Sequence, residues 1–202
     1  MRNATPPVKT EERMQSSYPD SLKGHLLIAM PGLSDPNFFQ TVTCICEHNA
    51  HGAMGIVVNR RHEALLGREI FEELNLPYTP AAGALPIYIG GPVHAGELFI
   101  LHGAPFGWDA CLEVTPALGL SNTRDILEAI AQDRGPTSFI ISLGCAGWGS
   151  GQLETEIKDN AWLTHPVFEQ SILDWPVEAR WEEALRRMGV NPTRLSDTAG
   201  HA

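Results

Sequence analysis

Residues 144–154 read G-C-A-G-W-G-S-G-Q-L-E, and this stretch is the most informative part of the chain about its fold. It follows the apolar run 138–143 and precedes a short helical pattern carried by Leu153 and Ile157. Glycine permits a positive φ and the close approach of a ligand or of another chain segment. Ordering four glycines in eight residues is entropically unfavourable, so a compensating contact is expected. The pattern predicts a strand, a glycine-rich turn around Trp148, and then a helix.

The composition is that of an acidic globular protein. The chain has 202 residues, which is long enough for one domain with its own core. Its 24 acidic residues exceed its 14 Lys and Arg, giving a formal net charge of −10. A nucleic-acid-binding surface usually needs a basic patch. The longest basic runs here are the pairs Arg60-Arg61 and Arg186-Arg187, so direct nucleic-acid binding is disfavoured.

No sequence segment indicates a membrane or an export signal. No apolar run approaches the roughly 20 residues that span a bilayer. Residues 1–20 lack the apolar core of a secretory signal. The four cysteines show no spacing typical of a disulfide framework. We therefore expect a cytoplasmic protein that does not bind membranes.

The domain organisation is expected to be simple. Residues 1–20 have the composition of a disordered N-terminal arm, and residues 191–202 that of a flexible C-terminal tail. Residues 21–190 contain no linker and no internal repeat, which predicts a single domain between them.

Strand patterns dominate the first half of the chain, with helices interspersed. The predicted strands cover residues 26–30, 38–47, 54–58, 87–89, 97–102, 111–114 and 137–143, with a hairpin turn at 49–52. Apolar residues at helical spacing predict helices at 70–74, 123–133 and 176–188. Strands in runs, rather than in strict alternation with helices, predict an α+β domain with a mixed sheet.

Four residues near the first hairpin invite a zinc interpretation. On a strand, Cys44, Cys46 and His48 would point to the same side, and His51 could join them from the turn. However, C-x-C spacing separates its thiols along a strand, unlike the C-x2-C of a zinc knuckle. Free cysteines also pack commonly in cores. We therefore expect no metal and no other cofactor.

Cys145 is the candidate nucleophile. It is predicted to follow a strand and precede a helix, whose N-terminus can lower the pKa of a thiol, with His102 or His165 as its base. The surrounding glycines do not match the G-x-S-x-G of a nucleophile elbow, and a small residue in a crowded turn explains Cys145 as well. An enzyme that uses Cys145 and His102 is therefore the alternative interpretation, and we assign no catalytic residue.

Two strand ends rich in glycine are predicted to line one shared groove. A tight turn would explain the glycines after strand 87–89 equally well. Two such strand ends in one small domain are, however, a common pocket arrangement. The candidate binding residues are those of the two turns and the polar side chains expected near them: Glu47, His48, Asn59, Gly90, Gly91, Pro92, His102, Gly147, Trp148, Gly149, Gln152 and Glu154.

Taken in order, several motifs resemble the YqgE/AlgH family. The motifs are E-H-N at 47–49, G-A-M-G-I-V-V-N at 52–59, G-G-P-V at 90–93, L-H at 101–102, G-W-G at 147–149, G-Q-L-E at 151–154 and N-A-W-L at 160–163, within residues 22–189. The resemblance implies a bacterial, intracellular protein with an α+β fold on a curved, partly barrel-like sheet. It implies no reaction, substrate, cofactor or catalytic residue. Cys145 stands where relatives usually have an aromatic residue, which argues against a thiol mechanism common to the family.

The sequence therefore predicts a non-catalytic binding or regulatory protein. Its groove would hold a partner protein, a peptide or a small-molecule ligand. Family members are usually labelled transcriptional regulators, so a direct DNA-binding regulator is a further alternative. The acidic charge disfavours it, and helix 123–133 is not a basic recognition helix. Any influence on transcription is therefore expected to be indirect.

The charge balance generates a prediction about DNA. The purified protein should give no mobility shift with duplex DNA at about 150 mM salt, because it offers few cations to replace phosphate counterions. Gel-shift titration against a pool of genomic fragments measures this. A sequence-specific shift that persists at this salt concentration would contradict the prediction.

Overall fold

The computed structural model describes residues 21–168 and 172–191. The predicted arm at 1–20 and the predicted tail beyond 191 lie outside the described residues. The strands are β1 (His25–Ala29), β2 (Val42–Asn49), β3 (Gly52–Val57), β4 (Arg61–Leu66), β5 (Pro86–Ile89), β6 (Val93–His102), β7 (Cys111–Thr115), β8 (Leu118–Ser121), β9 (Phe139–Gly149) and β10 (Trp162–Pro166). The helices are α1 (Gly67–Glu73), α2 (Pro80–Gly83), α3 (Arg124–Ala131), α4 (Gln152–Lys158) and α5 (Arg180–Arg187), with 3-10 turns η1 (Ile172–Asp174) and η2 (Val177–Ala179).

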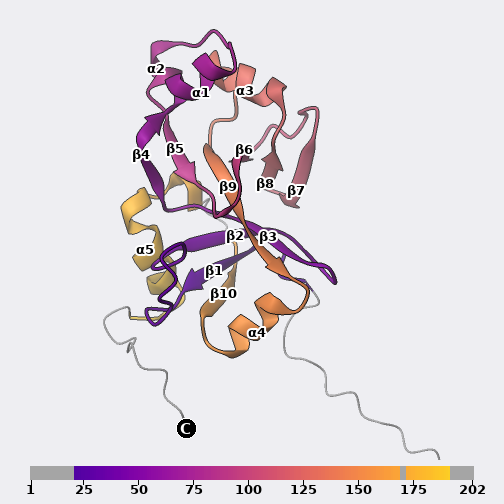
Figure 1. Cartoon of the computed structure of the whole chain (residues 1–202), viewed down its shortest axis with the longest axis vertical. Helices are drawn as coiled ribbons and strands as arrows, with labels where there is room; N and C mark the ends of the chain where they lie inside the picture. Colours follow the sequence, from indigo (N-terminus) through magenta and orange to yellow (C-terminus); the bar gives the residue numbers. More distant parts are fainter. Residues whose placement is uncertain (1–20, 169–171, 192–202) are drawn as a thin grey trace, which may run out of the picture.

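One curved sheet joins all of these strands. Its main path runs β10-β1-β2-β3-β9-β6-β8-β7, and β5 pairs with both β4 and β9. The β5–β9 pair is parallel and the other pairs are antiparallel, so the sheet is mixed. In Figure 1, α1, α2 and α3 cover one end of the molecule, α4 lies at the other, and α5 lies beside β1 and β2. The predicted α+β domain with a curved, partly barrel-like mixed sheet is confirmed.

Strand β9 connects the two halves of the sheet. Its first half, residues 139–143, pairs with β6 on one side and, over residues 141–143, with β5 on the other. Its second half, residues 146–149, pairs with β3. Between them Gly144 has a φ of 71°, in the left-handed region that favours glycine, and the strand bends there. The prediction of a turn after residue 143 is therefore wrong, because Gly144, Gly147 and Gly149 lie within a strand of 11 residues and only Gly151 follows it.

The bend in β9 is held by backbone contact with the turn that follows β5. A Cβ on Gly91, whose φ is 150°, would lie 2.3 Å from the carbonyl oxygen of Cys145. A Cβ on Gly144 would lie 2.4 Å from the oxygen of Gly91. The Gly90 N–H donates to the Leu143 carbonyl at 2.8 Å. This crossing of two backbones is the compensating contact that the glycine-rich sequence leads one to expect.

Three clusters of buried apolar residues fill the space between the sheet and the helices. Alternate residues of β2 face two of them: Cys44 and Cys46 face the first, which includes α5, and Ile45 faces the second, beneath α4. The alternation is as predicted as far as Cys46, but the register shifts between Ile45 and Glu47, so His48, opposite Ala53, faces the second cluster and the prediction that it shares a side with Cys44 and Cys46 is wrong. The third cluster lies beneath α1, α2 and α3 and includes Phe71 and Ile126.

Most predicted elements are present, with shifted ends. Strand β2 begins at Val42 rather than at residue 38, because Asn59 holds the preceding turn. Its Oδ1 accepts from the Val42 N–H at 2.8 Å, and its Nδ2 donates to the Gln40 carbonyl at 2.9 Å. The sequence pattern does not indicate β4, β8 or β10, which are short and carry charged residues, glycine or proline.

A buried arginine fixes the C-terminal segment to the sheet. Arg180 is 3% exposed, and burial lowers the pKa of its guanidinium. The guanidinium donates to the carbonyls of Val58, Leu173 and Trp175. Buried charge is unfavourable unless its hydrogen-bonding groups are satisfied, and here three carbonyls from two segments, the end of β3 and residues 173–175, satisfy them.

The crossing at Gly91 generates a stability prediction. Gly91→Ala should destabilise the domain by at least about 2 kcal/mol, because the new Cβ would overlap the Cys145 backbone and the φ suits glycine. Urea unfolding followed by tryptophan fluorescence measures the change. The matched control is Gly96→Ala, which introduces a Cβ with no heavy atom within 4 Å. Equal stability of the two variants would show that the crossing is not a tight constraint.

Candidate functional site

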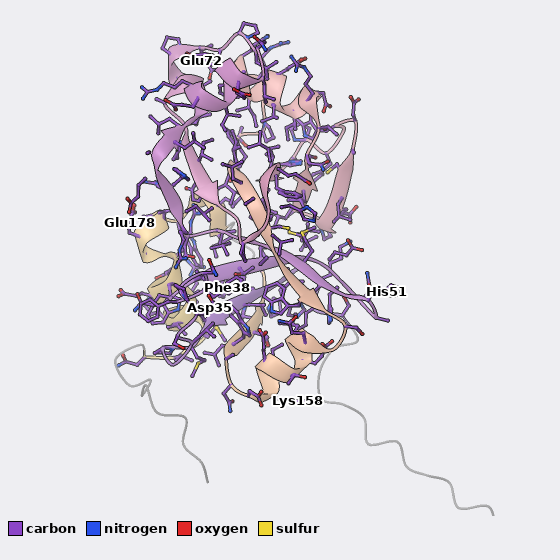
Figure 2. The ribbon with its side chains drawn as sticks, viewed as in Figure 1. Asp35, Phe38, His51, Glu72, Lys158 and Glu178 are labelled. Atoms are coloured by element: carbon purple, nitrogen blue, oxygen red, sulfur yellow. The ribbon has the colours of Figure 1, made fainter. Side chains whose placement is uncertain are left out.

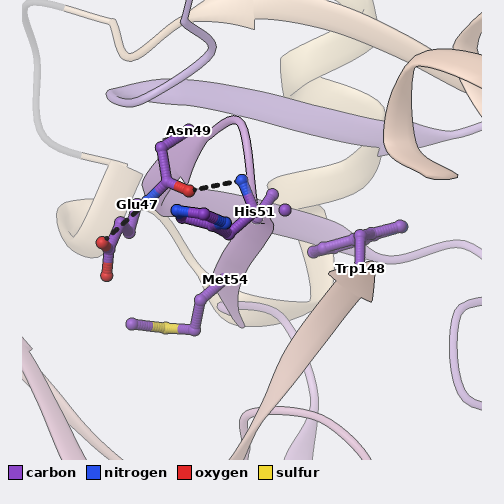
Figure 3. A pocket seen from close by; sticks show the side chains of 7 residues that line it. Glu47, Asn49, His51, Met54 and Trp148 are labelled. Atoms are coloured by element: carbon purple, nitrogen blue, oxygen red, sulfur yellow. Dashed lines mark hydrogen bonds between the residues drawn. The ribbon is translucent and has the colours of Figure 1, made fainter. Parts of the chain in front are cut away.

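A shallow hollow lies over the ends of β2, β3 and β9 (Figure 3). Strand pairing places six residues there in two rows: Glu47, Met54 and Gly147, and Asn49, Gly52 and Gly149. Because side chains alternate along a strand, these six positions share one face of the sheet. Three of them are glycines: Gly52 lines the hollow, and Gly147 and Gly149 lie beside it on the same face of the sheet. The cavity has a volume of about 210 Å³, and its lining residues are Glu47, Asn49, His51, Gly52, Ala53, Met54 and Trp148.

The glycines beneath the hollow differ in how strongly the fold requires them. Gly52 has a φ of 136°, and a Cβ there would lie 2.1 Å from the Trp148 carbonyl oxygen. In contrast, the nearest atom to a Cβ on Gly149 would be Gln152 Oε1 at 3.8 Å, and Gly149 has no positive φ. A glycine in a strand weakens the strand and often marks the close approach of a ligand or another backbone. Packing and backbone geometry therefore leave Gly149 unexplained.

A second cavity shares the Met54 side of the hollow. Met54 borders both, and the second cavity, also about 210 Å³, has mainly apolar walls. Its other residues are Phe99, Ala110, Leu112, Leu120, Ser121 and Asn122. The combined surface therefore has a polar end at the β2–β3 hairpin and an apolar end beside β6, β7 and β8.

Hydrogen bonds within the hairpin turn arrange the polar end. Asn49 Nδ2 donates to Glu47 Oε1 at 3.1 Å, and the His51 N–H donates to Asn49 Oδ1 at 2.8 Å (Figure 3). All three residues are exposed. His51 lies at the far tip of the hairpin (Figure 2). The Glu47 carboxylate therefore gives this end of the hollow an accessible negative charge.

Several predicted residues lie together on the opposite face of the sheet, beneath α4. His48 Nδ1 accepts the Leu22 N–H at 2.8 Å, which leaves the ring proton on Nε2, 2.9 Å from Glu154 Oε1. Trp148 is 6% exposed, and its indole N–H donates to Glu156 Oε2 at 2.9 Å. Its indole is therefore a core side chain rather than an exposed anchor.

The contacts of Glu156 were not predicted from the sequence. Its Oε2 accepts from both Trp148 Nε1 and Trp162 Nε1, the latter at 2.8 Å, and its Oε1 accepts from Gln152 Nε2 at 2.9 Å. The Phe38 ring packs against both indoles, with centroid separations of 6.0 Å and 5.5 Å. One carboxylate on α4 thereby fixes the helix to β9 and β10.

Asn59 and its neighbour Arg60 support a loop rather than the hollow. Arg60 donates to the carbonyls of Pro36, Asn37 and Phe39 at 2.7, 3.0 and 3.2 Å. Together with the Asn59 bonds to Gln40 and Val42, these contacts fix the segment before β2. Asn59, which was predicted near the groove, therefore has a structural role at the end of β3.

The two glycine-rich segments are adjacent, as predicted, but they fill each other's space. Gly90 and Gly91 lie against residues 144–146 with no room for a Cβ between them. Pro92 follows at the start of the exposed part of β6. The open surface therefore involves Gly147 and Gly149, and the glycines at 90 and 91 serve the bend in β9.

Cys145 and His102 do not form a pair. Cys145 lies opposite Val93 and His102 lies opposite Phe139, at the two ends of the β6–β9 ladder. Burial raises the pKa of the Cys145 thiol. The alternative of an enzyme that uses Cys145 with His102 is therefore wrong, because the fold separates the two side chains.

The residues considered as zinc ligands also diverge. Cys44 and Cys46 pack in the first core cluster, where a hydrogen bond with Cys44, followed by burial, raises the pKa of Cys46 well above its usual range. Both His48 nitrogens have partners, and His51 is exposed in the turn. Within residues 21–168 and 172–191, no group of three or more His, Cys, Asp or Glu is placed to hold a metal ion.

The described helices also include none that is long and apolar enough to cross a bilayer.

These features define a single-domain α+β protein whose curled sheet carries a glycine-floored hollow beside an apolar cavity. The family model described as AlgH-like matches residues 26–193. The chain therefore belongs to the AlgH-like family, as the sequence motifs predicted.

Relatives and solved structures agree with this assignment. The chain is similar to a UPF0301 protein of Desulforapulum autotrophicum, with 52% identity over 181 residues that cover 90% of this chain and 96% of that protein. A UPF0301 protein of Xanthomonas campestris is 44% identical over 188 residues, covering 93% and 100%. The solution structure of the AlgH protein from Pseudomonas aeruginosa matches with a TM-score of 0.75 and 45% identity, covering 94% of this chain and 100% of that one. A crystal structure from Corynebacterium diphtheriae, with a TM-score of 0.67, 22% identity and coverage of 86% and 90%, supports the fold alone.

The Glu156 contacts generate a second stability prediction. Glu156→Gln should destabilise the domain by about 1–3 kcal/mol. Both carboxylate oxygens accept hydrogen bonds, whereas the amide has one oxygen, so its NH2 group would face an indole N–H or the Gln152 amide N–H. Urea unfolding measures the change, with Glu63→Gln, an exposed position on β4, as the matched control. Equal stability of both variants would contradict a role of this carboxylate in anchoring α4.

Proposed function

We propose that the protein is a non-catalytic binding protein that holds an extended segment of a partner protein across the hollow. The observation that carries this proposal is the pair of exposed glycines beside the hollow: a Cβ on Gly147 would lie 3.3 Å from Val93 Cγ2, and one on Gly149 would meet nothing closer than 3.8 Å. Both residues are exposed, and at Gly149 neither packing nor backbone geometry requires a glycine. Missing side chains allow another backbone to approach closely, so these glycines suit a peptide ligand.

The edge of β9 supports the same proposal. Residues 146–149 pair with β3 on one side, while the ladder with β6 ends at Cys145 on the other. Among the described residues no strand continues that ladder. The Gly149 N–H donates to Gln152 Oε1 at 3.0 Å, so a bound peptide would replace this side chain as its partner. Extended peptides bind such strand edges through main-chain hydrogen bonds and gain specificity from neighbouring side-chain pockets.

The walls of the two cavities indicate what the partner segment contains. Each cavity is about 210 Å³, whereas pockets for drug-sized ligands usually measure roughly 300–1,000 Å³. Each is therefore better suited to one side chain than to a whole small molecule. The cavity beside Leu112 and Leu120 suits an apolar side chain. The end beside the Glu47 carboxylate suits a basic or amide-bearing side chain.

A regulatory role would follow from this binding. The formal net charge of −10 favours a protein partner over DNA, so an effect on transcription would be exerted through the partner. All four cysteines are free thiols, which suits a reducing cytoplasm, and we place the binding there.

The proposal predicts that filling the hollow abolishes binding without unfolding the protein. Gly149→Val should fold normally, since valine favours strands and the position is open, but its side chain should cover the backbone. Selection from a random peptide display library provides ligands for the unmodified protein. Calorimetric titration should then show at least about tenfold weaker binding to Gly149→Val, a loss of about 1.4 kcal/mol.

The matched control is Gly107→Val, which places the same side chain on an exposed loop with no heavy atom within 4 Å of its Cβ. Selected peptides should bind this variant and the unmodified protein equally. The proposal is refuted if the library yields no ligand, or if selected peptides bind Gly149→Val as tightly as Gly107→Val.

A further inference from the structure

Three reactive side chains meet on the side of β6, β7 and β8 away from the first core cluster. Cys111 lies directly opposite Ser121, and His102 lies opposite Gly119. Their neighbours Leu101, Leu112 and Leu120 pack into the first core cluster or against it. His102 Nε2 is 3.0 Å from Ser121 Oγ and 3.7 Å from Cys111 Sγ. The sequence gives no indication of this cluster, because β8 was not predicted.

The imidazole of His102 is oriented as a base. Its Nδ1 donates to the Gly103 carbonyl at 2.6 Å, which leaves the lone pair on Nε2 facing the hydroxyl and the thiol. Burial lowers the pKa of His102, so the ring is neutral near pH 7. The rings of Phe106 and Trp108 lie beside the imidazole, with centroid separations of 5.8 and 6.4 Å. One Nε2 lone pair therefore faces two competing donors, Ser121 and Cys111.

Cys111 differs from the other three cysteines in its accessibility. Cys44, Cys46 and Cys145 are at most 3% exposed, whereas Cys111 is only partly buried. Burial raises the pKa of the Cys145 thiol. A hydrogen bond between Cys46 and Cys44 raises the pKa of the Cys46 thiol. Thiol exchange needs both an accessible sulfur and a means of losing its proton. Of the four cysteines, Cys111 alone combines partial exposure of the residue with a neighbouring neutral imidazole.

We propose that Cys111 is a site of thiol–disulfide exchange with a small cationic disulfide, with His102 as the base. Cys111 Sγ attacks one sulfur of the disulfide R–S–S–R, and its proton passes to His102 Nε2. The S–S bond of the reagent breaks as the new Cys111–S–S–R bond forms, and the departing thiolate takes the proton from His102. The products are a mixed disulfide on Cys111 and one molecule of R–SH, with no other oxidant or reductant required.

The charged residues around the cluster indicate whether a positively or a negatively charged disulfide reagent is preferred. Residues 93–121 contain no Lys or Arg. Asp109 and Glu113, each two residues from Cys111, are exposed. The Asp109 N–H also donates to the Asp125 carboxylate at 2.8 Å, which brings a further negative charge to this loop. A cationic reagent is therefore attracted and an anionic one repelled.

Cystamine, a small dicationic disulfide, is the probe. Intact-protein mass spectrometry of the full chain should show one cysteamine adduct, located at Cys111 by peptide mapping and absent in Cys111→Ser. Oxidised glutathione, which carries net negative charge, should react more slowly than cystamine. An adduct on another cysteine, no adduct, or equal rates for the two reagents would overturn the proposal.

Two variants separate chemistry from accessibility. His102→Gln should slow the reaction at least about tenfold, because the base is lost. Ser121→Ala should accelerate it about twofold or more, because the competing hydroxyl no longer occupies Nε2. If His102→Gln does not fold, the reaction rate of Ser121→Ala with cystamine tests the role of His102 by itself. A rate unchanged or lowered in Ser121→Ala would contradict competition for one lone pair and overturn the role of His102.

Discussion

The rest of the structure depends on the backbone contact between Gly91 and residues 144–145. These two segments cross so closely that a Cβ on Gly91 or Gly144 would overlap the opposite chain. The contact holds the bend in β9, and the bend lets one strand pair with β5 and β6 over its first half and with β3 over its second. The sheet consequently curls instead of continuing as a flat layer. The last residues of β9 thereby emerge beside the β2–β3 hairpin, where the hollow forms.

The buried indole of Trp148 then decides which face of β9 is open. Because side chains alternate, Gly147 and Gly149 must face away from the cluster that contains Trp148. Glu156 holds the indole and that of Trp162, and thereby fixes α4 directly after the strand. A shift of register by one residue would bring Trp148 to the surface and bury the glycines. The stability of the second core cluster and the position of the candidate site are therefore coupled through one residue.

The sequence was informative where a local pattern has a local cause. The alternation of residues 42–46 in β2, the hairpin turn at 49–52 and the helix around Ile126 follow from periodicity and turn chemistry, and all are present in the fold. The sequence predicts a turn at the bend in β9, because a glycine with positive φ inside a strand cannot be distinguished in sequence from a glycine that ends the strand. The contacts of Glu156 could not be found, since they depend on how the turns on either side of α4 direct Trp148 and Trp162. Those of Cys111 and Ser121 could not be found, since they depend on pairing with β8, which the sequence pattern does not indicate. As a result, the predicted groove residues lie in three places: on one face of the sheet, on the opposite face, and where Gly90 and Gly91 pack against residues 144–146.

The central claim is that the glycine-floored hollow receives an extended peptide. Amide chemical-shift mapping of the labelled protein with a library-selected peptide tests it most directly. The largest shifts should fall on Gly52, Met54, Gly147 and Gly149, with smaller ones at Leu112 and Leu120 in the apolar cavity. Shifts centred instead on α5, or on the loop around Phe39, would place binding elsewhere and contradict the claim.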